Sequence, residues 1–348
     1  MREPLAQSYP LYVPGVQRAT PPSGSRRRAD PARYRHGRIE SDMTTGFEAA
    51  LIAWYAANAR DLPWRRPGVG AWPVLVSEFM LQQTPVSRVL PAYHAWLSRW
   101  PTAAELAGAT PADAVRQWGN LGYPRRAIRL HESARIIADT HRGQVPESFA
   151  ELIKLPGVGS YTAAAVASFA YGQRHPVLDT NVRRVLGRVL AGQEFPAATV
   201  SVAERSLAMS IVPPADDRRA ATWSAAMMEL GALVCMSSRP SCRSCPLAGQ
   251  CSWRLAGSPA GPRARQQKPY AGSDRECRGR LLAQLRNASG PVPAHALNRS
   301  WPVAEQRRRM LAGLIDEGMI ARIGDGLIGL PGDGPQPMDR TAGPLLSP

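Results

Sequence analysis

Residues 155–163 read Leu-Pro-Gly-Val-Gly-Ser-Tyr-Thr-Ala, and the rest of the chain is organised around them. A helix-like run over residues 146–154 leads into this stretch, and a run of small residues follows it over 161–171. Pro156 cannot continue a helix, and the two glycines permit positive φ angles and close backbone approach. The pattern predicts two helices joined by a tight hairpin, whose outward-facing amides form a site for a phosphate. The alternative is an ordinary loop between two core helices.

The size and charge of the chain limit the classes of function to consider. Its 348 residues suffice for two or three domains with their own cores, and the formal net charge is +16. The excess of 43 basic over 27 acidic residues favours a polyanion as partner. Nearly all the basic residues are arginine, which GC-rich coding also produces, so charge alone does not identify the partner. No run of about 18 apolar residues occurs, so we expect no membrane span.

The first 42 residues differ in composition from the rest of the chain. They contain eight arginines, four acidic residues and six prolines, without apolar periodicity. We predict a disordered extension, whose basic run over residues 25–28 either touches DNA, serves in targeting or is simply solvated. Met43 is a second candidate for the start of translation.

Apolar residues recur at helical spacing along most of the chain, which predicts a mainly α protein. Before the quoted stretch, the predicted helices cover residues 45–59, 72–84, 87–100, 102–107, 111–118 and 125–141. After it, they cover residues 223–234, 278–285 and 303–317, and a further helix begins after Asp179.

Glu78 is an acidic residue inside the most apolar of these helices, over residues 72–84. Apolar side chains occupy nearly all sides of that helix, so it is expected to be buried. Burial without a partner raises the pKa of a carboxyl group and makes it a proton donor near neutral pH. The alternative is a structural glutamate paired with an arginine across the core.

Two polar motifs lie outside the hairpin. Tyr123 follows a glycine and precedes Arg125 and Arg126, which suits a base-stacking wedge with phosphate contacts, or a plain helix connection with a packing tyrosine. Asp179 is followed two residues later by Asn181 at the start of a helix. An N-cap accounts for Asp179 without any catalysis, but the two roles are compatible.

Four cysteines are crowded into seventeen residues, with the spacing Cys235-x6-Cys242-x2-Cys245-x5-Cys251. Such an array suits a reducing compartment, because it is not the pattern of a secreted disulfide framework. Four thiolates enclose either one tetrahedral zinc ion or a four-iron cluster, and the spacing does not choose between them. Cys277 lies outside the array and is predicted to be an ordinary free thiol.

The C-terminal part follows a linker rich in Gly, Pro, Ser and Arg over residues 256–276. Two helical patterns are followed by apolar runs at 320–323 and 327–330, with Gly-Asp-Gly between them as a hairpin turn. We therefore predict a small winged-helix-like module over residues 277–333, and a tail over 334–348. The arginines at 307–309 either track phosphates or form a solvated helix face.

Taken together, these motifs resemble adenine DNA glycosylases of the MutY type, in the endonuclease III-like helix-hairpin-helix superfamily. The resemblance covers residues 45–255 and rests on four motifs in the same order. They are Ser-Glu-x-Met-Leu-Gln-Gln-Thr at 77–84, Gly-x-Leu-Gly-Tyr at 119–123, the hairpin, and Asp-x-Asn-Val-Arg-Arg at 179–184 with the cysteine array.

The resemblance implies a two-domain helix-hairpin-helix glycosylase fold with an iron–sulfur cluster loop. A six-helix barrel domain with the hairpin would cover residues 71–175. The cluster-bearing domain would combine residues 43–70 with 176–234, and the cluster loop would cover 235–255. In this family the four cysteines bind a [4Fe–4S] cluster, which favours iron over zinc.

The resemblance also implies a base excision repair reaction, the hydrolysis of the N-glycosidic bond of adenine paired with 8-oxoguanine or guanine in duplex DNA. Glu78 would protonate the N7 atom of the everted adenine, and ionised Asp179 would stabilise the positive sugar. Asn181 would orient water or Asp179, and Tyr161 would shape the sugar pocket. Tyr161 also replaces the lysine nucleophile of endonuclease III, so we expect a monofunctional enzyme.

DNA contacts follow from the same motifs. Gln83 and Tyr123 would insert beside the opposing base, with Leu81 and Thr84 close by and Arg126 on a phosphate. The hairpin residues Gly157, Val158 and Gly159 would hold the backbone of the duplex. The expected protein is a monomer in the cytoplasm, associated with the nucleoid.

The C-terminal module departs from the family pattern, because the common family member carries a Nudix-like domain there that recognises 8-oxoguanine. We therefore expect weaker discrimination between 8-oxoguanine and guanine. Two alternative functions remain from the residues. One is an endonuclease III-type glycosylase and lyase acting on damaged pyrimidines, and the other is a non-catalytic DNA-binding protein.

Overall fold

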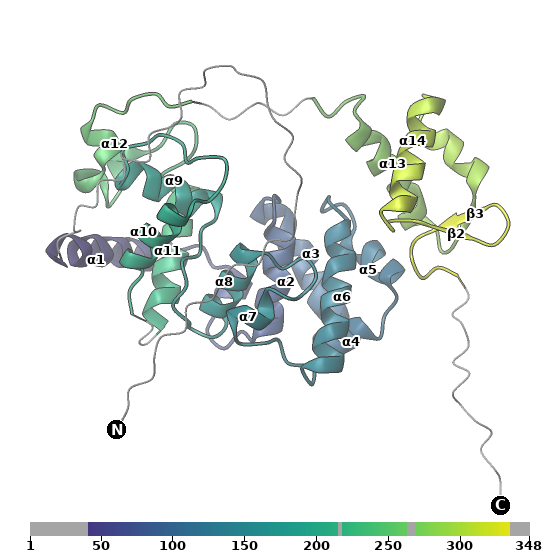
Figure 1. Ribbon diagram of the computed structural model, residues 1–348, viewed down its shortest axis with the longest axis horizontal. Coiled ribbons are helices and arrows are strands. Elements are labelled where there is room, and N and C mark those ends of the chain that lie inside the picture. Colours follow the sequence, from purple (N-terminus) through teal and green to yellow (C-terminus); the bar gives the residue numbers. More distant parts are fainter. Residues whose placement is uncertain (1–40, 215–217, 263–268, 335–348) are drawn as a thin grey trace, which may run out of the picture. The chain divides into compact units, whose positions relative to one another are not determined.

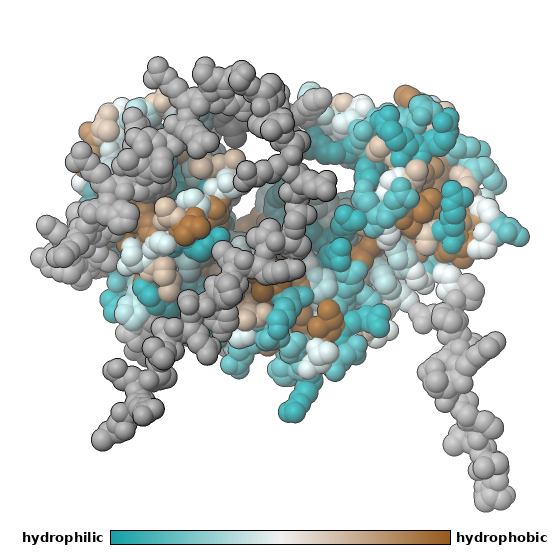
Figure 2. All heavy atoms as spheres, viewed as in Figure 1, coloured by the Kyte–Doolittle hydropathy of each residue, from teal (hydrophilic) through white to brown (hydrophobic). Residues whose placement is uncertain are grey.

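A computed structural model of the chain describes residues 41–214, 218–262 and 269–334, with the side chains of 41–45 left aside. The protein is mainly α-helical with one small sheet, as the sequence predicts (Figure 1). On the face shown in Figure 2, hydrophilic residues cover most of the described surface and apolar residues form separate patches. Among the described helices, none has the length and apolar character needed to cross a membrane.

Seven helices occupy the region predicted as a six-helix barrel, because the short turns α4 and α7 also count. They are α2 (Ala71–Leu81), α3 (Val86–Arg99), α4 (Ala103–Ala107), α5 (Pro111–Trp118), α6 (Arg125–Thr140), α7 (Phe149–Leu152) and α8 (Ser160–Phe169). Thr102 and Thr110 begin α4 and α5 with complete capping boxes, which satisfy the first amides of each helix. Helix α2 is buried on nearly all sides and packs on α3, α6 and α8.

A second group of helices surrounds the cysteines and has its own apolar cluster, which includes Leu51, Trp223 and Leu247. Its elements are α1 (Ser41–Asn58), α9 (Thr180–Val189), α10 (Val202–Ile211), α11 (Arg219–Leu233), η4 (Cys242–Ser244), η5 (Ala248–Gln250) and α12 (Ser252–Leu255). The short turn η2 (Pro63–Arg65) packs on α2 instead, and its Trp64 belongs to the other apolar cluster. Helix α10 was not predicted. Helix α1 begins at Ser41 and so includes the last two residues of the segment predicted to be disordered, whose other residues, 1–40, lie outside the described part.

The hairpin forms between α7 and α8, although its first helix is a single turn rather than the predicted run. Gly157 has a φ of +80°, and a Cβ atom there would lie 2.8 Å from both Phe79 and Arg129. Only glycine therefore allows this close approach of the backbone to α2 and α6. Gly159 is the N-cap residue of α8, so amides of its first turn face out of the hairpin.

The C-terminal module contains two long helices and a small antiparallel sheet, in keeping with the winged-helix-like prediction. Its elements are α13 (Asp274–Asn287), β1 (Val292–Pro293), η6 (Ala294–Ser300), α14 (Ala304–Asp316), β2 (Ala321–Ile323) and β3 (Leu327–Gly329). The strand order is β1-β3-β2, and β2 and β3 form the predicted hairpin. Strand β1 and η6 were not predicted. Cys277 is a buried free thiol in the core beside Leu281 and Leu285.

Polar contacts join the module to α5 and to the loop that follows it. Arg116 pairs with the nearly buried Asp333 at 2.7 Å and donates to the carbonyl oxygen of Ala288. Arg286 donates to the side chain of Asn120 at 2.6 Å. The linker is shorter than predicted, because α13 begins at Asp274, and residues 263–268 of it lie outside the described part, as does the tail beyond 334.

A buried ion pair connects α11 to the segment that precedes α2. Glu229 has no exposed side-chain surface and accepts hydrogen bonds from Arg60 at 2.6 Å and Arg65 at 2.7 Å. Burial alone would raise the pKa of Glu229, but the hydrogen bonds from Arg60 and Arg65 lower it to about 2. None of these three residues was assigned a role from the sequence.

We predict that Glu229 couples folding stability to acid pH. Its folded pKa is below the unfolded value of about 4.3, so its contribution is complete above that pH and is lost between about 4.3 and 2. Glu229→Gln should remove that part of the pH dependence and cost about 3 kcal/mol at pH 7, because the charged Arg60 and Arg65 are left without a negatively charged partner. Urea unfolding between pH 7 and 3 measures both effects.

The matched control is Glu132→Gln, which breaks an exposed pair with Arg129 and should cost less than about 1 kcal/mol. Equal losses in the two variants would contradict the assignment.

Candidate active site and cysteine centre

One large cleft brings together most of the residues singled out from the sequence. Its volume is about 1210 Å³, and it lies between α2, α8, the start of α9 and α11. The predicted residues that line it are Glu78, Leu81, Gln83, Thr84, Tyr161, Asp179 and Asn181. The two acids, which are 101 positions apart in the sequence, therefore face one cavity.

Glu78 is a buried carboxyl group at the base of the cleft. Its side chain belongs to α2, its Oε2 atom has no hydrogen-bond partner among the described residues, and the residue is 3% exposed. Burial raises the pKa of Glu78 to about 7, Asp179 adds to the rise, and Tyr161 and Arg65 oppose it. The predicted alternative, a direct ion pair across the core, is not formed. The carboxyl group therefore holds a proton close to neutral pH and has an oxygen free to deliver it.

Tyr161 lies in the first turn of α8, between the two acids. Burial raises the pKa of Tyr161 well above its ordinary value, and the negative charges of Glu78 and Asp179 raise it further. The phenol is therefore neutral, and its hydroxyl group lies close enough to Glu78 to lower the pKa of that carboxyl group. The hairpin thus determines where this hydroxyl group sits, because Gly159 fixes the start of α8.

Asp179 is the N-cap residue of α9 and faces the cleft as well, so both roles weighed from the sequence coexist. Its Oδ1 atom accepts from the amide of Val182 at 2.6 Å, and its Oδ2 atom accepts from the side chain of Asn181 at 2.8 Å. Burial raises the pKa of Asp179, whereas these hydrogen bonds and the charge of Arg184 oppose the rise. The pKa stays raised overall, and the hydrogen bonds to both oxygens stabilise the ionised form against burial.

Arg184 and Gly231 position Asn181. Arg184 belongs to the quoted motif at 179–184, but no role was predicted for it, and Gly231 was not singled out from the sequence. Arg184 donates at 2.7 Å to the Oδ1 atom of Asn181, to the carbonyl oxygen of Gly231 and to that of Cys235. A Cβ atom at Gly231 would lie 2.6 Å from that of Asn181. A glycine inside the helical pattern of 223–234 was the available signal, since such a residue usually marks a close approach.

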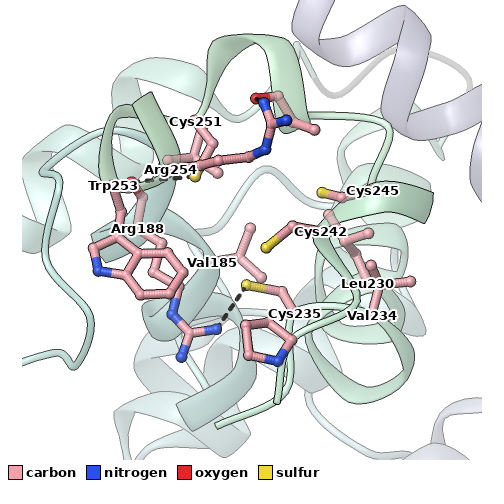
Figure 3. Close-up of a pocket in the computed structure, with 13 residues that line it drawn as sticks. Val185, Arg188, Leu230, Val234, Cys235, Cys242, Cys245, Cys251, Trp253 and Arg254 are labelled. Atoms are coloured by element: carbon pink, nitrogen blue, oxygen red, sulfur yellow. Dashed lines mark hydrogen bonds between the residues drawn. The ribbon is translucent and has the colours of Figure 1, made fainter. Parts of the chain in front are cut away.

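The four cysteines of the array line one small apolar cavity next to α9 and α11, and Figure 3 shows their sulfur atoms turned toward a common space. All four are free thiols. Arg188 donates to the sulfur of Cys235 at 3.4 Å and to the carbonyl oxygen of Met236, and its guanidinium lies over the ring of Trp253. Among the described residues, no three His, Cys, Asp or Glu side chains meet at the spacing of a single metal ion. An all-sulfur donor set around a shared cavity fits a thiolate-bound cluster.

Gln83 and Tyr123 are exposed and have left-handed backbones, with φ angles of 54° and 48°. Gln83 lines the cleft, whereas Tyr123 lies outside it with 49% of its surface exposed. Exposed non-glycine residues with positive φ cluster at functional sites, because the surroundings must hold the strain. Their geometry is compatible with the predicted wedge.

The structure corrects two of the predicted DNA contacts. Arg126 is 8% exposed, and its guanidinium donates to backbone carbonyls such as those of Phe79 and Gly122, so it is not available to a phosphate. The side chain of Val158 is buried, and its amide donates to the carbonyl oxygen of Leu155 at 3.0 Å inside the hairpin. Gly157 and Gly159 are exposed, as predicted for a backbone contact.

Comparison with known proteins gives matches to the sequence and to the fold. Residues 76–208 match the model of the HhH-GPD superfamily base excision DNA repair proteins. The chain is 51% identical to an adenine DNA glycosylase of Mycolicibacterium smegmatis, over 82% of this chain and 96% of that protein. It is 43% identical to the human adenine DNA glycosylase, over 60% of this chain and 40% of that one.

Among solved structures, a thermostable thymine-DNA glycosylase shares the fold, with a TM-score of 0.55 and 24% identity over 61% of this chain and 97% of that one. The match to the family model includes both carboxylate motifs, those of Glu78 and Asp179. The chain therefore belongs to the adenine DNA glycosylase family, within the HhH-GPD superfamily of base excision DNA repair proteins.

Proposed function

We propose that the protein hydrolyses the N-glycosidic bond of adenine paired with 8-oxoguanine or guanine in duplex DNA. The observation that carries this proposal is the unpartnered carboxyl oxygen of Glu78, which faces the same cleft as Asp179. One carboxyl group has an oxygen without a hydrogen-bond partner among the described residues, and the other accepts hydrogen bonds at both oxygens, a difference that suits an acid and a charge stabiliser in one reaction.

The target adenine must leave the helical stack before its glycosidic bond can be reached. A cleft of about 1210 Å³ has room for a whole nucleotide. Exposed Gln83 at the edge of the cleft and exposed Tyr123 near it are placed to fill the gap beside the opposing base. We expect Thr84 and Leu81 to shape the cleft rather than to contact bases, since Thr84 is 7% exposed.

Glu78 acts on the leaving group. Adenine leaves poorly as an anion, and protonation of its N7 atom lets the base depart neutral. General acid assistance of this kind contributes about 100- to 10,000-fold. The pKa of about 7 supports this role, because near neutral pH a large fraction of Glu78 is protonated and the proton is still readily transferred.

Asp179 acts on the sugar. Cleavage of the bond leaves oxocarbenium character on the deoxyribose ring, and an ionised carboxylate beside it lowers the barrier electrostatically. Asn181 and the amide of Val182 hold the carboxylate in place. Water then adds to the sugar carbon, and the proton it releases restores the acid form of Glu78, so that the products are free adenine and an abasic site.

Tyr161 occupies the position where a lyase of the superfamily carries an amine. A neutral phenol cannot form a Schiff base with the sugar, so we propose a monofunctional glycosylase. We also propose that the protein acts as a monomer. Lys154, the nearest lysine in the sequence, is exposed on the other side of the hairpin and pairs with Glu151.

We further propose that Cys235, Cys242, Cys245 and Cys251 hold a [4Fe–4S] cluster. The cluster would supply no step of the hydrolysis. When bound, it would fix the loop that presents exposed Arg239 and Arg243 for contacts with the DNA backbone. Burial raises the pKa of the Cys235 thiol, and the hydrogen bond from Arg188 to its sulfur opposes that rise, as a thiolate ligand requires.

Adenine release should depend on protonated Glu78. Single-turnover rates on duplex with adenine opposite 8-oxoguanine are expected to fall tenfold per pH unit above about 7, because the acid loses its proton. Glu78→Gln should lower the rate by about 100- to 10,000-fold and leave the affinity for the duplex unchanged.

The thermal midpoint separates chemistry from folding. The buried carboxyl group is raised in pKa, so it destabilises the folded protein increasingly as pH rises from about 4.3 toward 7. Glu78→Gln should therefore not lower the midpoint at pH 8. A variant with full activity, or one that fails to fold, would contradict the role assigned to Glu78.

Borohydride should trap no covalent complex. A Schiff base between protein and abasic DNA would be reduced to a stable crosslink, visible by gel electrophoresis, and the chain offers no amine at position 161. A strong crosslink from purified protein would contradict the monofunctional assignment. If methylation of the lysines then abolished that crosslink, the nucleophile would be identified as a lysine.

Purified protein should contain about four iron atoms per chain and show broad visible absorbance. Cys242→Ser should lose both, while Cys277→Ala, whose thiol lies in a separate core, should keep both. Metal analysis that finds zinc in the wild-type protein would contradict the cluster.

A further inference from the structure

Arg126 hydrogen-bonds to three backbone segments that carry residues of the proposed reaction. Its Nη1 atom donates to the carbonyl oxygens of Phe79, Met80 and Gln82, at 2.7, 3.0 and 2.7 Å. Its Nη2 atom donates to the hydroxyl of Thr84 at 2.9 Å and to the carbonyl oxygen of Gly122 at 3.0 Å. One buried guanidinium therefore spans the end of α2, the turn after it and the loop before α6.

The acceptors of Arg126 flank both residues of the proposed wedge. Gln82 and Thr84 are the neighbours of Gln83, and Gly122 immediately precedes Tyr123. Both wedge residues have left-handed backbones, a conformation that costs on the order of 1–3 kcal/mol and persists only where the surroundings enforce it. The hydrogen bonds of Arg126 supply that enforcement on both loops at once.

The surroundings of the guanidinium hold it in one orientation. Its central carbon lies 5.1 Å from the ring centroid of Trp118 and 5.6 Å from that of Tyr123. Trp118 also donates to the carbonyl oxygen of Gly122 at 3.0 Å. Arginine suits this place better than lysine, because its planar group reaches several acceptors in fixed directions.

We propose that Arg126 is a positioning residue, which holds Gln83 and Tyr123 together as one rigid wedge and fixes that wedge relative to the turn of α2 that carries Glu78. Displacement of the opposing base and delivery of the proton are thereby tied to one geometry. The inference rests on the proposed function, since a wedge and an acid are needed only if adenine is everted and released.

Arg126→Lys tests the proposal, because it keeps the charge and removes the multiple directed bonds. Arg174→Lys is a matched control, since Arg174 also donates to backbone carbonyls, those of Met209, Val212 and Pro213, and does not line the cleft. Arg126→Gln, which buries no charge, is the second variant if the lysine variant does not fold.

The measurement is the single-turnover rate of adenine release on two duplexes. In one, adenine faces 8-oxoguanine, and in the other it faces a tetrahydrofuran abasic analogue, so no opposing base has to be displaced. We expect Arg126→Lys to slow the first reaction by about 10- to 100-fold, as for misplacement of a catalytic geometry by about 1 Å, and the second much less. Arg174→Lys should change neither rate.

A double-mutant cycle and a fluorescent probe test how Arg126 acts. If Arg126 acts through the wedge, Arg126→Lys should slow adenine release little further in a Gln83→Ala background. If the two residues act independently, the two rate effects should be additive in free energy. With 2-aminopurine in place of the target adenine, Arg126→Lys should lower the fluorescence rise that reports eversion, a readout that does not depend on bond cleavage.

Equal slowing on both duplexes, additive effects or an unchanged fluorescence rise would overturn the positioning role. Wild-type protein that releases no adenine opposite 8-oxoguanine would instead refute the proposed function. Active wild-type protein with an unaffected Arg126→Lys variant would refute only the inference drawn here.

Discussion

The structure depends on keeping one carboxyl group, that of Glu78, out of water without giving it a partner. Such a group is expensive to bury, and the surrounding fold has to hold the apolar helix α2 in place against that cost. Helices α3, α6 and α8 enclose α2, and the missing side chain at Gly157 lets the hairpin approach Phe79 closely. The hairpin is therefore a support for the acid as well as a candidate contact with DNA.

Arginine has two uses in this protein, and the net charge alone does not separate them. Some arginines are exposed, but Arg126, Arg183, Arg184 and Arg188 are each less than 10% exposed. These buried guanidinium groups mainly bind backbone carbonyl oxygens at helix ends and loops. The excess of basic residues thus overstates the charge that a polyanion would meet, because part of it holds the protein together.

Much of the fold and of the site could be predicted from the sequence where the signal is local. Glu78 stands out as an acid in an apolar helix, Asp179 as a helix cap, and the cysteines by their spacing. Contacts between distant segments give no such signal. Nothing in the sequence around Arg126 shows that its guanidinium faces α2 rather than solvent, and the same is true of the Arg184 contact with Asn181. Strand β1 was missed because two residues are too short for a periodic pattern.

The neutral phenol of Tyr161 has a consequence for what happens to the DNA afterwards. On the proposed chemistry the sugar that has lost its base keeps both of its phosphodiester bonds, and it is a reactive aldehyde in equilibrium with its ring form. A second protein must therefore cut the strand at the abasic site. Until that protein binds, the cleft shields the reactive aldehyde from other nucleophiles. Slow departure from the damaged strand would then protect the chromosome, even though it limits how many lesions one molecule can process.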